Sequence, residues 1–201
     1  MELHLNGRSI DLKETQIDFL NTGISDVFAQ KNNKTLQETI KHRRYAKFTK
    51  EIELQYAEYI DYPLGTFLMT LKEKGDLFYK QFLNPYGDSY YCAFSLRDKD
   101  VAVLKGIYAF FVRETLMYIG RCCNDFYNRI TMGYGRISPK NCYIDGQATN
   151  CHINQLINVN VENTRLFYCS LSDNIEIKKI EKTLIKTYNP EWNISMKVKL
   201  I

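Results

Sequence analysis

Glu181, near the end of the chain, lies in a sequence context that predicts a bound cation. Ile177 and Leu184 are four and three positions away, so on a helix its carboxylate projects from the edge of an apolar stripe. A carboxylate there is costly unless it is paired or bound to a cation. One acid completed by waters and phosphate oxygens suits Mg²⁺, with Mn²⁺ as an alternative, so Glu181 is the predicted metal ligand. The open alternative is an ion pair with Lys178 or Lys182.

Arg129 and two tyrosines, Tyr108 and Tyr118, could supply the other groups that phosphodiester hydrolysis needs. A guanidinium stays charged at any working pH and can contact two phosphate oxygens, which relieves charge in the transition state. A tyrosine acts as a base only if nearby cations lower its pKa from about 10. The alternatives are a surface arginine and two half-buried strand aromatics.

Four short motifs place these residues in a fixed order. Gly106-Ile107-Tyr108 and Tyr118-Ile119-Gly120 fall on successive predicted strands, and Asp125-Phe126-Tyr127-Asn128-Arg129 follows on a predicted helix. The last motif, residues 180–193, reads IEKTLIKTYNPEWN. Together the four motifs resemble the GIY-YIG nuclease family over residues 106–193. The resemblance does not extend to residues 1–104.

The resemblance implies roles for particular side chains. Tyr108 would position or deprotonate the attacking water, and Tyr118 would support it by hydrogen bonding. Arg121 stands where the family usually has lysine and would keep that positive charge in a different geometry. Asn193 would hold the Glu181 helix and the tyrosine strands in register through its amide.

Two further departures from the family pattern concern the surroundings of Arg129. The interval from Gly120 to Arg129 is one residue longer than usual, which predicts a bulged turn before the helix. Many members carry His or Tyr four residues after the arginine, where this chain has Gly133. Tyr134 or His152 could take that place, so the identity of the general base stays open.

The elements that must hold these residues predict an α+β catalytic domain over residues 105–201. Antiparallel strands are expected at 106–112, 116–119 and 165–171. Helices are expected at 125–132, 150–158 and 174–188. Asp173 can cap the last helix, and Pro190 ends it. The result is a small three-stranded antiparallel sheet flanked by helices, as in the GIY-YIG fold.

Residues 1–104 predict a mainly helical accessory region for substrate recognition, opened by a β-hairpin. Segments 2–5 and 8–12 alternate in polarity around Asn6-Gly7, a strong two-residue turn signal. Beyond them, short helices and a strand are expected at 64–72, 76–83 and 90–96.

Between these segments, a capping-box pattern from Thr35 to Glu38 begins a helix expected to run to about Ile60. Arg43 and Arg44 belong to a basic cluster interleaved with aromatic side chains on this helix. Such a face either contacts nucleic acid or is simply solvated.

The segment 133–149 is rich in Gly and polar residues, and a loop this long is usually functional or mobile. Arg136 and Lys140 on it could hold a nucleic-acid strand. The alternative is a plain surface connection.

The composition indicates the cellular compartment in which the chain is expected and the redox state of its cysteines. No apolar stretch is long enough to span a membrane, and the first residues lack a secretory pattern, so a cytoplasmic protein without a membrane partner is expected. The six cysteines form no CxxC pair, which favours reduced thiols. A zinc site of Cys142, Cys151 and His152 is a weak alternative, because the spacing matches no strong pattern.

Charge is unevenly distributed and favours a polyanionic partner for the second half of the chain. Residues 105–201 carry 13 Lys and Arg against 8 Asp and Glu, whereas residues 1–104 carry 14 against 15. With the motifs, this predicts a metal-dependent endonuclease of double-stranded DNA, best described as a site-specific restriction enzyme. Double-strand cleavage would need a homodimer or sequential nicking. The alternatives are a repair, recombination or mobile-element nuclease, or a catalytically idle binding module.

Overall fold

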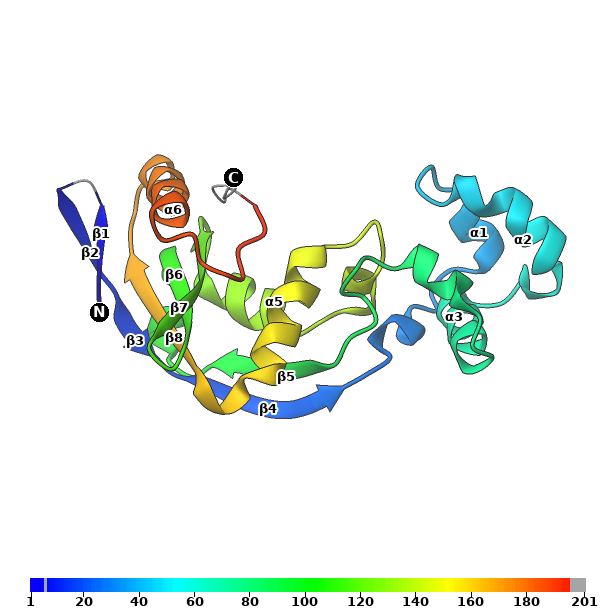
Figure 1. The fold of residues 1–201 in the computed structure, drawn as a ribbon, viewed down its shortest axis with the longest axis horizontal. Helices are drawn as coiled ribbons and strands as arrows, with labels where there is room; N and C mark the ends of the chain where they lie inside the picture. The colour runs from blue at the N-terminus through cyan, green and yellow to red at the C-terminus, as the bar shows by residue number, and fades with distance from the viewer. Residues whose placement is uncertain (6, 196–201) are drawn as a thin grey trace. The chain divides into compact units, whose positions relative to one another are not determined.

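The computed structural model describes residues 1–5 and 7–195 and divides the chain into two compact units (Figure 1). We call residues 1–21, 92–136 and 156–201 the sheet unit, of which residue 6 and residues 196–201 are not described, and residues 22–91 and 137–155 the helical unit. The predicted α+β class is confirmed. The predicted division at residue 104 differs from these units, because segments from both halves of the chain contribute to each of them.

The sheet unit is built on a four-stranded antiparallel sheet in the order β3-β8-β6-β7. These strands are β3 (Lys13–Thr15), β6 (Gly106–Val112), β7 (Thr115–Cys122) and β8 (Thr164–Ser170). The prediction of three strands lacked β3, in which Glu14 pairs with Phe167 of β8. Sequence reasoning missed this strand because three residues carry too little alternation to indicate one.

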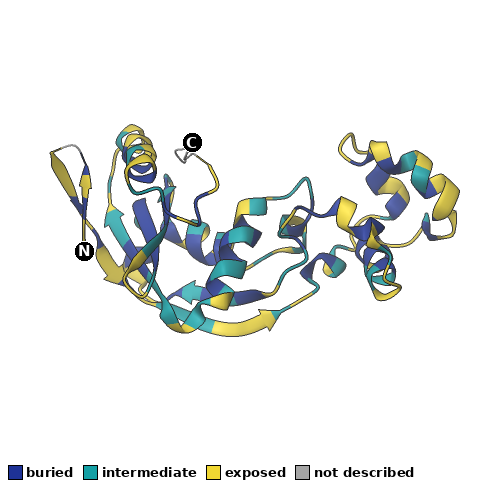
Figure 2. Cartoon of the chain, viewed as in Figure 1, coloured by how far each residue is buried: buried dark blue, intermediate teal, exposed yellow. Residues whose placement is uncertain are grey.

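Both faces of strand β6 are covered, so its residues from Gly106 to Phe111 are all buried (Figure 2). Ile107 and Phe111 belong to an apolar core shared with α6 (Asn174–Tyr188). On the opposite face, the rings of Tyr108 and Phe110 contact the ring of Tyr134. Because side chains alternate between the two faces of a strand, one face of β6 packs in an apolar core and the other packs against tyrosine rings.

The N-terminal hairpin is part of the sheet unit's core. Strands β1 (Glu2–Leu5) and β2 (Arg8–Asp11) pair in the predicted register, Leu5 with Arg8, while Asn6 of the predicted turn lies outside the described residues. Four hairpin residues join the core of α6: Leu3, Leu5, Ile10 and Leu12. The first residues thus support the sheet unit, which their position in the sequence did not suggest.

Helix α6 begins and ends as predicted. The Asp173 side chain accepts a hydrogen bond from the Ile175 amide at its start. Asn189 takes a left-handed conformation (φ 45°) at its end, and Pro190 prevents continuation. This fixes the helix that carries Glu181.

The remaining strands and helices are short, and three of them contain residues of both units. A two-stranded sheet joins β4 (Ile17–Ile24) to β5 (Tyr91–Leu96), and helix α4 (Lys99–Ala102) follows β5. Helix α5 (Ala148–Val159) and the single turn η7 (Val161–Asn163) lead into β8.

The helical unit consists of short helices around an aromatic core. They are η1 (Val27–Gln30), α1 (Leu36–Ile40), η2 (Ala46–Phe48), α2 (Thr49–Gln55), η3 (Ala57–Tyr59), α3 (Leu64–Glu73), η4 (Leu77–Phe82) and η6 (Pro139–Cys142). The capping box is confirmed, since the Glu38 amide donates to the Thr35 hydroxyl and the Thr35 amide to the Glu38 carboxylate.

The single helix predicted to run from Leu36 to Ile60 is wrong. The chain turns between α1 and η2, and Tyr45 stacks on Phe82 with ring centroids 5.7 Å apart. Phe48 also packs on Phe82, at 4.9 Å. Burying these rings stabilises the broken path more than helix propensity stabilises a continuous one.

Part of the segment 133–149, which was predicted to be a functional or mobile loop, is packed into the core of the helical unit. Tyr143 is fully buried, donates its hydroxyl proton to the Phe28 carbonyl at 2.9 Å, and forms a β-bridge with Leu83.

Among the described residues, no helix is both long and apolar enough to cross a bilayer.

Candidate active site

Three tyrosine hydroxyls and one guanidinium form a hydrogen-bonded cluster on one face of the sheet. Arg129 donates from Nε to the Tyr108 hydroxyl at 3.0 Å and from Nη2 to the Tyr134 hydroxyl at 2.5 Å. The Tyr134 hydroxyl lies 3.0 Å from the hydroxyls of both Tyr108 and Tyr118. The guanidinium carbon also lies 4.5 Å from the centre of the Tyr134 ring. The structure therefore brings four of the predicted site residues together.

A π-helix, η5 (Tyr127–Tyr134), explains how Tyr134 reaches Arg129. Its amides bond to carbonyls five residues back, and Gly135 N donates to Ile130 O at 2.7 Å in this way. Residues five apart share a face in such a helix, so Tyr134 occupies the place that the fourth residue after Arg129 has in an α-helix. The shift by one residue from Gly133 to Tyr134 is thus absorbed within the helix.

Strand β5 holds this helix in place. The Leu96 amide donates to the Thr131 hydroxyl at 3.0 Å, and the Phe94 amide donates to the Gly135 carbonyl at 3.1 Å. A side chain at Gly135 would overlap the Phe94 carbonyl oxygen, so glycine is required there. Sequence reasoning missed these contacts, since they join segments about forty residues apart without a local pattern.

The protonation of Tyr108 is set mainly by burial. Its side chain is fully buried, and burial raises its pKa above the ordinary value although the nearby Arg129 charge lowers it. The pKa of Tyr134 is raised for the same first reason. The expectation that cations would depress the pKa of Tyr108 does not hold here. Both hydroxyls are thus neutral, and they orient Arg129 by accepting its protons.

Gly120 is the residue that makes room for Tyr108. The two residues face each other across β6 and β7, and the ring of Tyr108 lies directly over the glycine. A Cβ on Gly120 would overlap the Tyr108 ring and hydroxyl. The spacing of the two tripeptides therefore has a steric reason.

We expect Gly120→Ala to displace Tyr108 and break its hydrogen bond with Arg129. Overpacking of this kind costs about 1–3 kcal/mol of stability. Thermal melting monitored by circular dichroism would measure the loss. A variant that melts at the wild-type temperature would contradict this role for Gly120.

Glu181 is buried on α6 and forms an ion pair with Arg121 of β7. Burial raises the pKa of its carboxyl, while the charges of Arg121 and Arg129 lower it, and the net direction is upward. Arg129 thus connects both parts of the site, because it bonds to Tyr108 and Tyr134 and its charge acts on Glu181. The predicted alternative pairing of Glu181 with Lys178 or Lys182 is not seen, since its partner is Arg121.

Among the predicted site residues, Glu181 offers the carboxylate that a hard divalent cation would need. Within the described part of the chain, no group of three or more His, Cys, Asp or Glu side chains could hold a metal ion. The zinc alternative of Cys142, Cys151 and His152 is therefore wrong. A buried carboxylate whose pKa is raised gains from added positive charge, and waters with phosphate oxygens would complete the ligand set. Arg121, about a third exposed, would have to move aside.

Asn193 bonds to β7, which is an edge strand of the four-stranded sheet. Its side-chain oxygen accepts from the Ile119 amide at 3.0 Å, and its side-chain nitrogen donates to the Ile119 carbonyl at 2.8 Å. Trp192 adds a backbone bond to the Met117 carbonyl. The segment after α6 is thus tied to the strand between Tyr118 and Gly120.

We expect Asn193→Ala to destabilise the protein by about 2–3 kcal/mol, since it leaves a buried amide and carbonyl of Ile119 without partners. Chemical denaturation would measure this change. Asn193→Asp is the matched comparison, because aspartate can still accept from the amide but repels the carbonyl. Unchanged stability of both variants would contradict the role of this amide.

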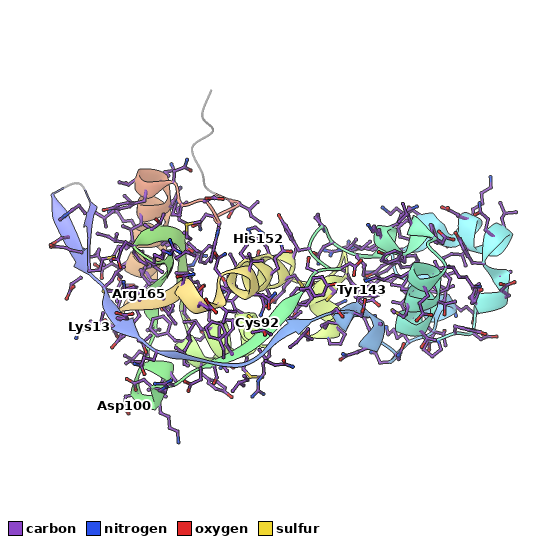
Figure 3. The ribbon with its side chains drawn as sticks, turned by 60° about the horizontal axis from the view of Figure 1, so that its bottom comes forward. Lys13, Cys92, Asp100, Tyr143, His152 and Arg165 are labelled. Atoms are coloured by element: carbon purple, nitrogen blue, oxygen red, sulfur yellow. The ribbon has the colours of Figure 1, made fainter. Side chains whose placement is uncertain are left out.

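The other predicted substrate-binding residues belong to other segments of the chain. Arg136 is exposed at the end of the sheet unit's middle segment, whereas the others belong to the helical unit: Arg43, Arg44, Lys140 and His152. There Arg44 donates to the Ile144 carbonyl at 3.0 Å, and Lys140 pairs with Asp145. His152, labelled in Figure 3, lies on α5, and the centroid of its ring is 4.5 Å from that of the Tyr86 ring. The structure thus gathers Tyr134 around Arg129, whereas His152 belongs to the other unit.

No family model, curated protein or solved structure matches this chain. Function is therefore inferred from the chemistry of the residues alone.

Proposed function

We propose that this chain is a metal-dependent endonuclease that hydrolyses phosphodiester bonds in DNA, of the type that the GIY-YIG motifs indicate. The observation that carries the proposal is the arrangement of Arg129, whose guanidinium is fixed by Tyr108 and Tyr134 while its charge acts on Glu181. A cation fixed by neutral acceptors keeps its charge for an anionic partner, and a phosphate group is the anion that arginine contacts best.

Arg129 performs the main electrostatic step in this mechanism. The hydrogen bonds that Arg129 donates to the Tyr108 and Tyr134 hydroxyls fix the plane of its guanidinium before the substrate binds. Little reorganisation is then needed as negative charge develops on the phosphate. Tyr108, Tyr118 and Tyr134 act as positioning residues. The three hydroxyls carry three protons, and the two hydrogen bonds among them use two of these protons. The third proton can be donated to a group outside the three tyrosines, such as the attacking water or the phosphate.

Glu181 would hold the divalent cation, with Mg²⁺ the first choice and Mn²⁺ the alternative. When bound, such an ion neutralises charge on the phosphate and the leaving oxygen. Arg121 neutralises Glu181 without the ion, and it can contact a phosphate once it leaves that carboxylate.

Within this class we propose a site-specific restriction enzyme in which the helical unit contributes recognition. The helical unit carries exposed basic side chains, Arg43 among them. Two copies of the chain, or two successive nicks, would cut both strands.

One observation favours a second candidate, a catalytically idle DNA-binding module. Tyr108 and Tyr134 are fully buried and Glu181 is occupied by Arg121, so the cluster could serve only to hold the fold. The two candidates differ in whether the protein turns over its substrate.

Plasmid nicking separates these candidates. Supercoiled DNA is incubated with wild type and with Glu181→Ala, in Mg²⁺ and in EDTA, while binding is followed by gel shift. Cleavage by wild type in Mg²⁺ alone, with binding but no cleavage by the variant, is the expected result. Tight binding with intact plasmid in every case would support the idle module and overturn the nuclease proposal.

A further inference from the structure

The helical unit contains a cavity of about 700 Å³ that the proposed nuclease chemistry does not use. Two segments form its wall, residues 30–45 and 138–145, and both belong to that unit. The cations on the wall are Lys31, Lys34, Lys140 and, when protonated, His42. Cations gathered on a concave surface are a feature that recognises anions.

The two carboxylates on the same wall are already engaged. Asp145 accepts the Tyr45 hydroxyl proton at 2.5 Å and pairs with Lys140. Glu38 accepts the Thr35 amide proton at 2.8 Å in the capping box. Three lysines against two carboxylates leave the wall with an excess of positive charge.

Lys31 is the lysine on the wall whose charge burial disfavours. It is partly buried, forms no ion pair with any residue that the structure describes, and places its Nζ 4.9 Å from the ring centre of Tyr143, labelled in Figure 3. Burial is the main cause that lowers the pKa of Lys31, and the positive charges of Lys140 and Lys34 lower it further. The negative charge of Asp145 raises it and only partly offsets these effects. A cation that is disfavoured by its neighbours gains from a bound anion.

We infer that this cavity binds a phosphate group, supplied either by a nucleic-acid backbone or by a free phosphate or nucleotide. Lys31 contacts the anion from the floor, since it is the least exposed of the three lysines, and Lys34 and Lys140 close over it from two segments of the chain. The inference is independent of the nuclease proposal, because none of these residues belongs to the Arg129 cluster.

Binding by the full chain without divalent metal tests this inference. A fluorescent 20-base-pair duplex is followed by anisotropy, and pyrophosphate and thymidine monophosphate are followed by calorimetry. Lys31→Met removes the charge but keeps the stem, and we expect about tenfold weaker binding because a hydrogen bond to a charged group is lost. Lys34→Met is a second variant at an exposed position, and Lys99→Met, at an exposed position of the sheet unit outside the cavity, is the matched control.

The outcomes identify the source of the phosphate. If Lys31→Met and Lys34→Met weaken binding of the duplex but not of the small phosphates, the phosphate belongs to a nucleic-acid backbone. The number of ions released on duplex binding should then fall by about one for each lysine replaced. Weakening of pyrophosphate or nucleotide binding indicates a free ligand. The inference is overturned if Lys31→Met and Lys34→Met bind every probe as wild type does, or if Lys99→Met weakens binding equally.

Discussion

Replacing Arg129 by alanine is expected to lower the rate of plasmid nicking by about 10³-fold, the loss seen when a single group that stabilises transition-state charge is removed. The structure explains why no neighbour can substitute. The guanidinium is held by Tyr108 and Tyr134, which are neutral and cannot supply a positive charge. Single-turnover nicking rates at saturating protein would separate this loss from weaker binding.

Two comparisons keep this result interpretable. The tyrosine hydroxyls retain their contacts with one another in Arg129→Ala, so the variant should keep a cooperative thermal transition. Arg129→Lys keeps a charge but cannot donate to both hydroxyls at once, and we expect it to remain more than about tenfold slower than wild type. Global unfolding of Arg129→Ala would mark this arginine as a structural residue.

The strands and the tyrosine cluster could be predicted because their signals are local. The two tripeptides lie on strands that alternate between apolar and tyrosine faces. The hairpin that joins these strands is confirmed, but the strand predicted to begin at residue 116 begins at Thr115, so the turn consists of Arg113 and Glu114. Helix α6 was predictable for the same reason, since its cap and its proline lie next to it in the sequence.

The choice between Tyr134 and His152 could not be made from the sequence, because it depends on the type of helix. An α-helix would have placed Gly133 near Arg129, whereas the π-helix places Tyr134 there. The bonds that anchor this helix come from β5, which lies far away in the sequence. Long-range contacts of this kind override local patterns.

The role of the N-terminal segment was beyond sequence reasoning for a similar reason. Leu3 and Leu5 are buried against α6, and Tyr188 of that helix accepts a hydrogen bond from the His4 amide at 2.6 Å. A region that served recognition alone could be deleted without loss of the chemistry. Because deleting residues 1–104 removes part of the sheet unit's core, it would instead destabilise the candidate site itself.

Glu181→Gln is expected to abolish nicking, again by about 10³-fold, without lowering stability at neutral pH. Burial raises the pKa of Glu181 above its ordinary value of 4.5 despite the charges of Arg121 and Arg129. The stability that this carboxyl contributes is therefore fully present below pH 4.5 and is lost as the pH rises through the raised pKa. Glutamine imitates the protonated form, so the variant should melt at or above the wild-type temperature at pH 7, and the difference should vanish at low pH.

Magnesium supplies the second measurement on Glu181→Gln, with a readout that does not depend on cleavage. An ion that binds only the folded protein stabilises it by mass action, so adding Mg²⁺ should raise the melting temperature of wild type. The glutamine variant lacks the anionic ligand and should show no such rise. Because the carboxylate must be ionised to hold the ion, the wild-type rise should shrink as the pH falls through the raised pKa of Glu181. Equal stabilisation of both proteins by Mg²⁺ would place the metal elsewhere, and a variant that melts well below wild type at pH 7 would show that the Arg121 pair serves the fold.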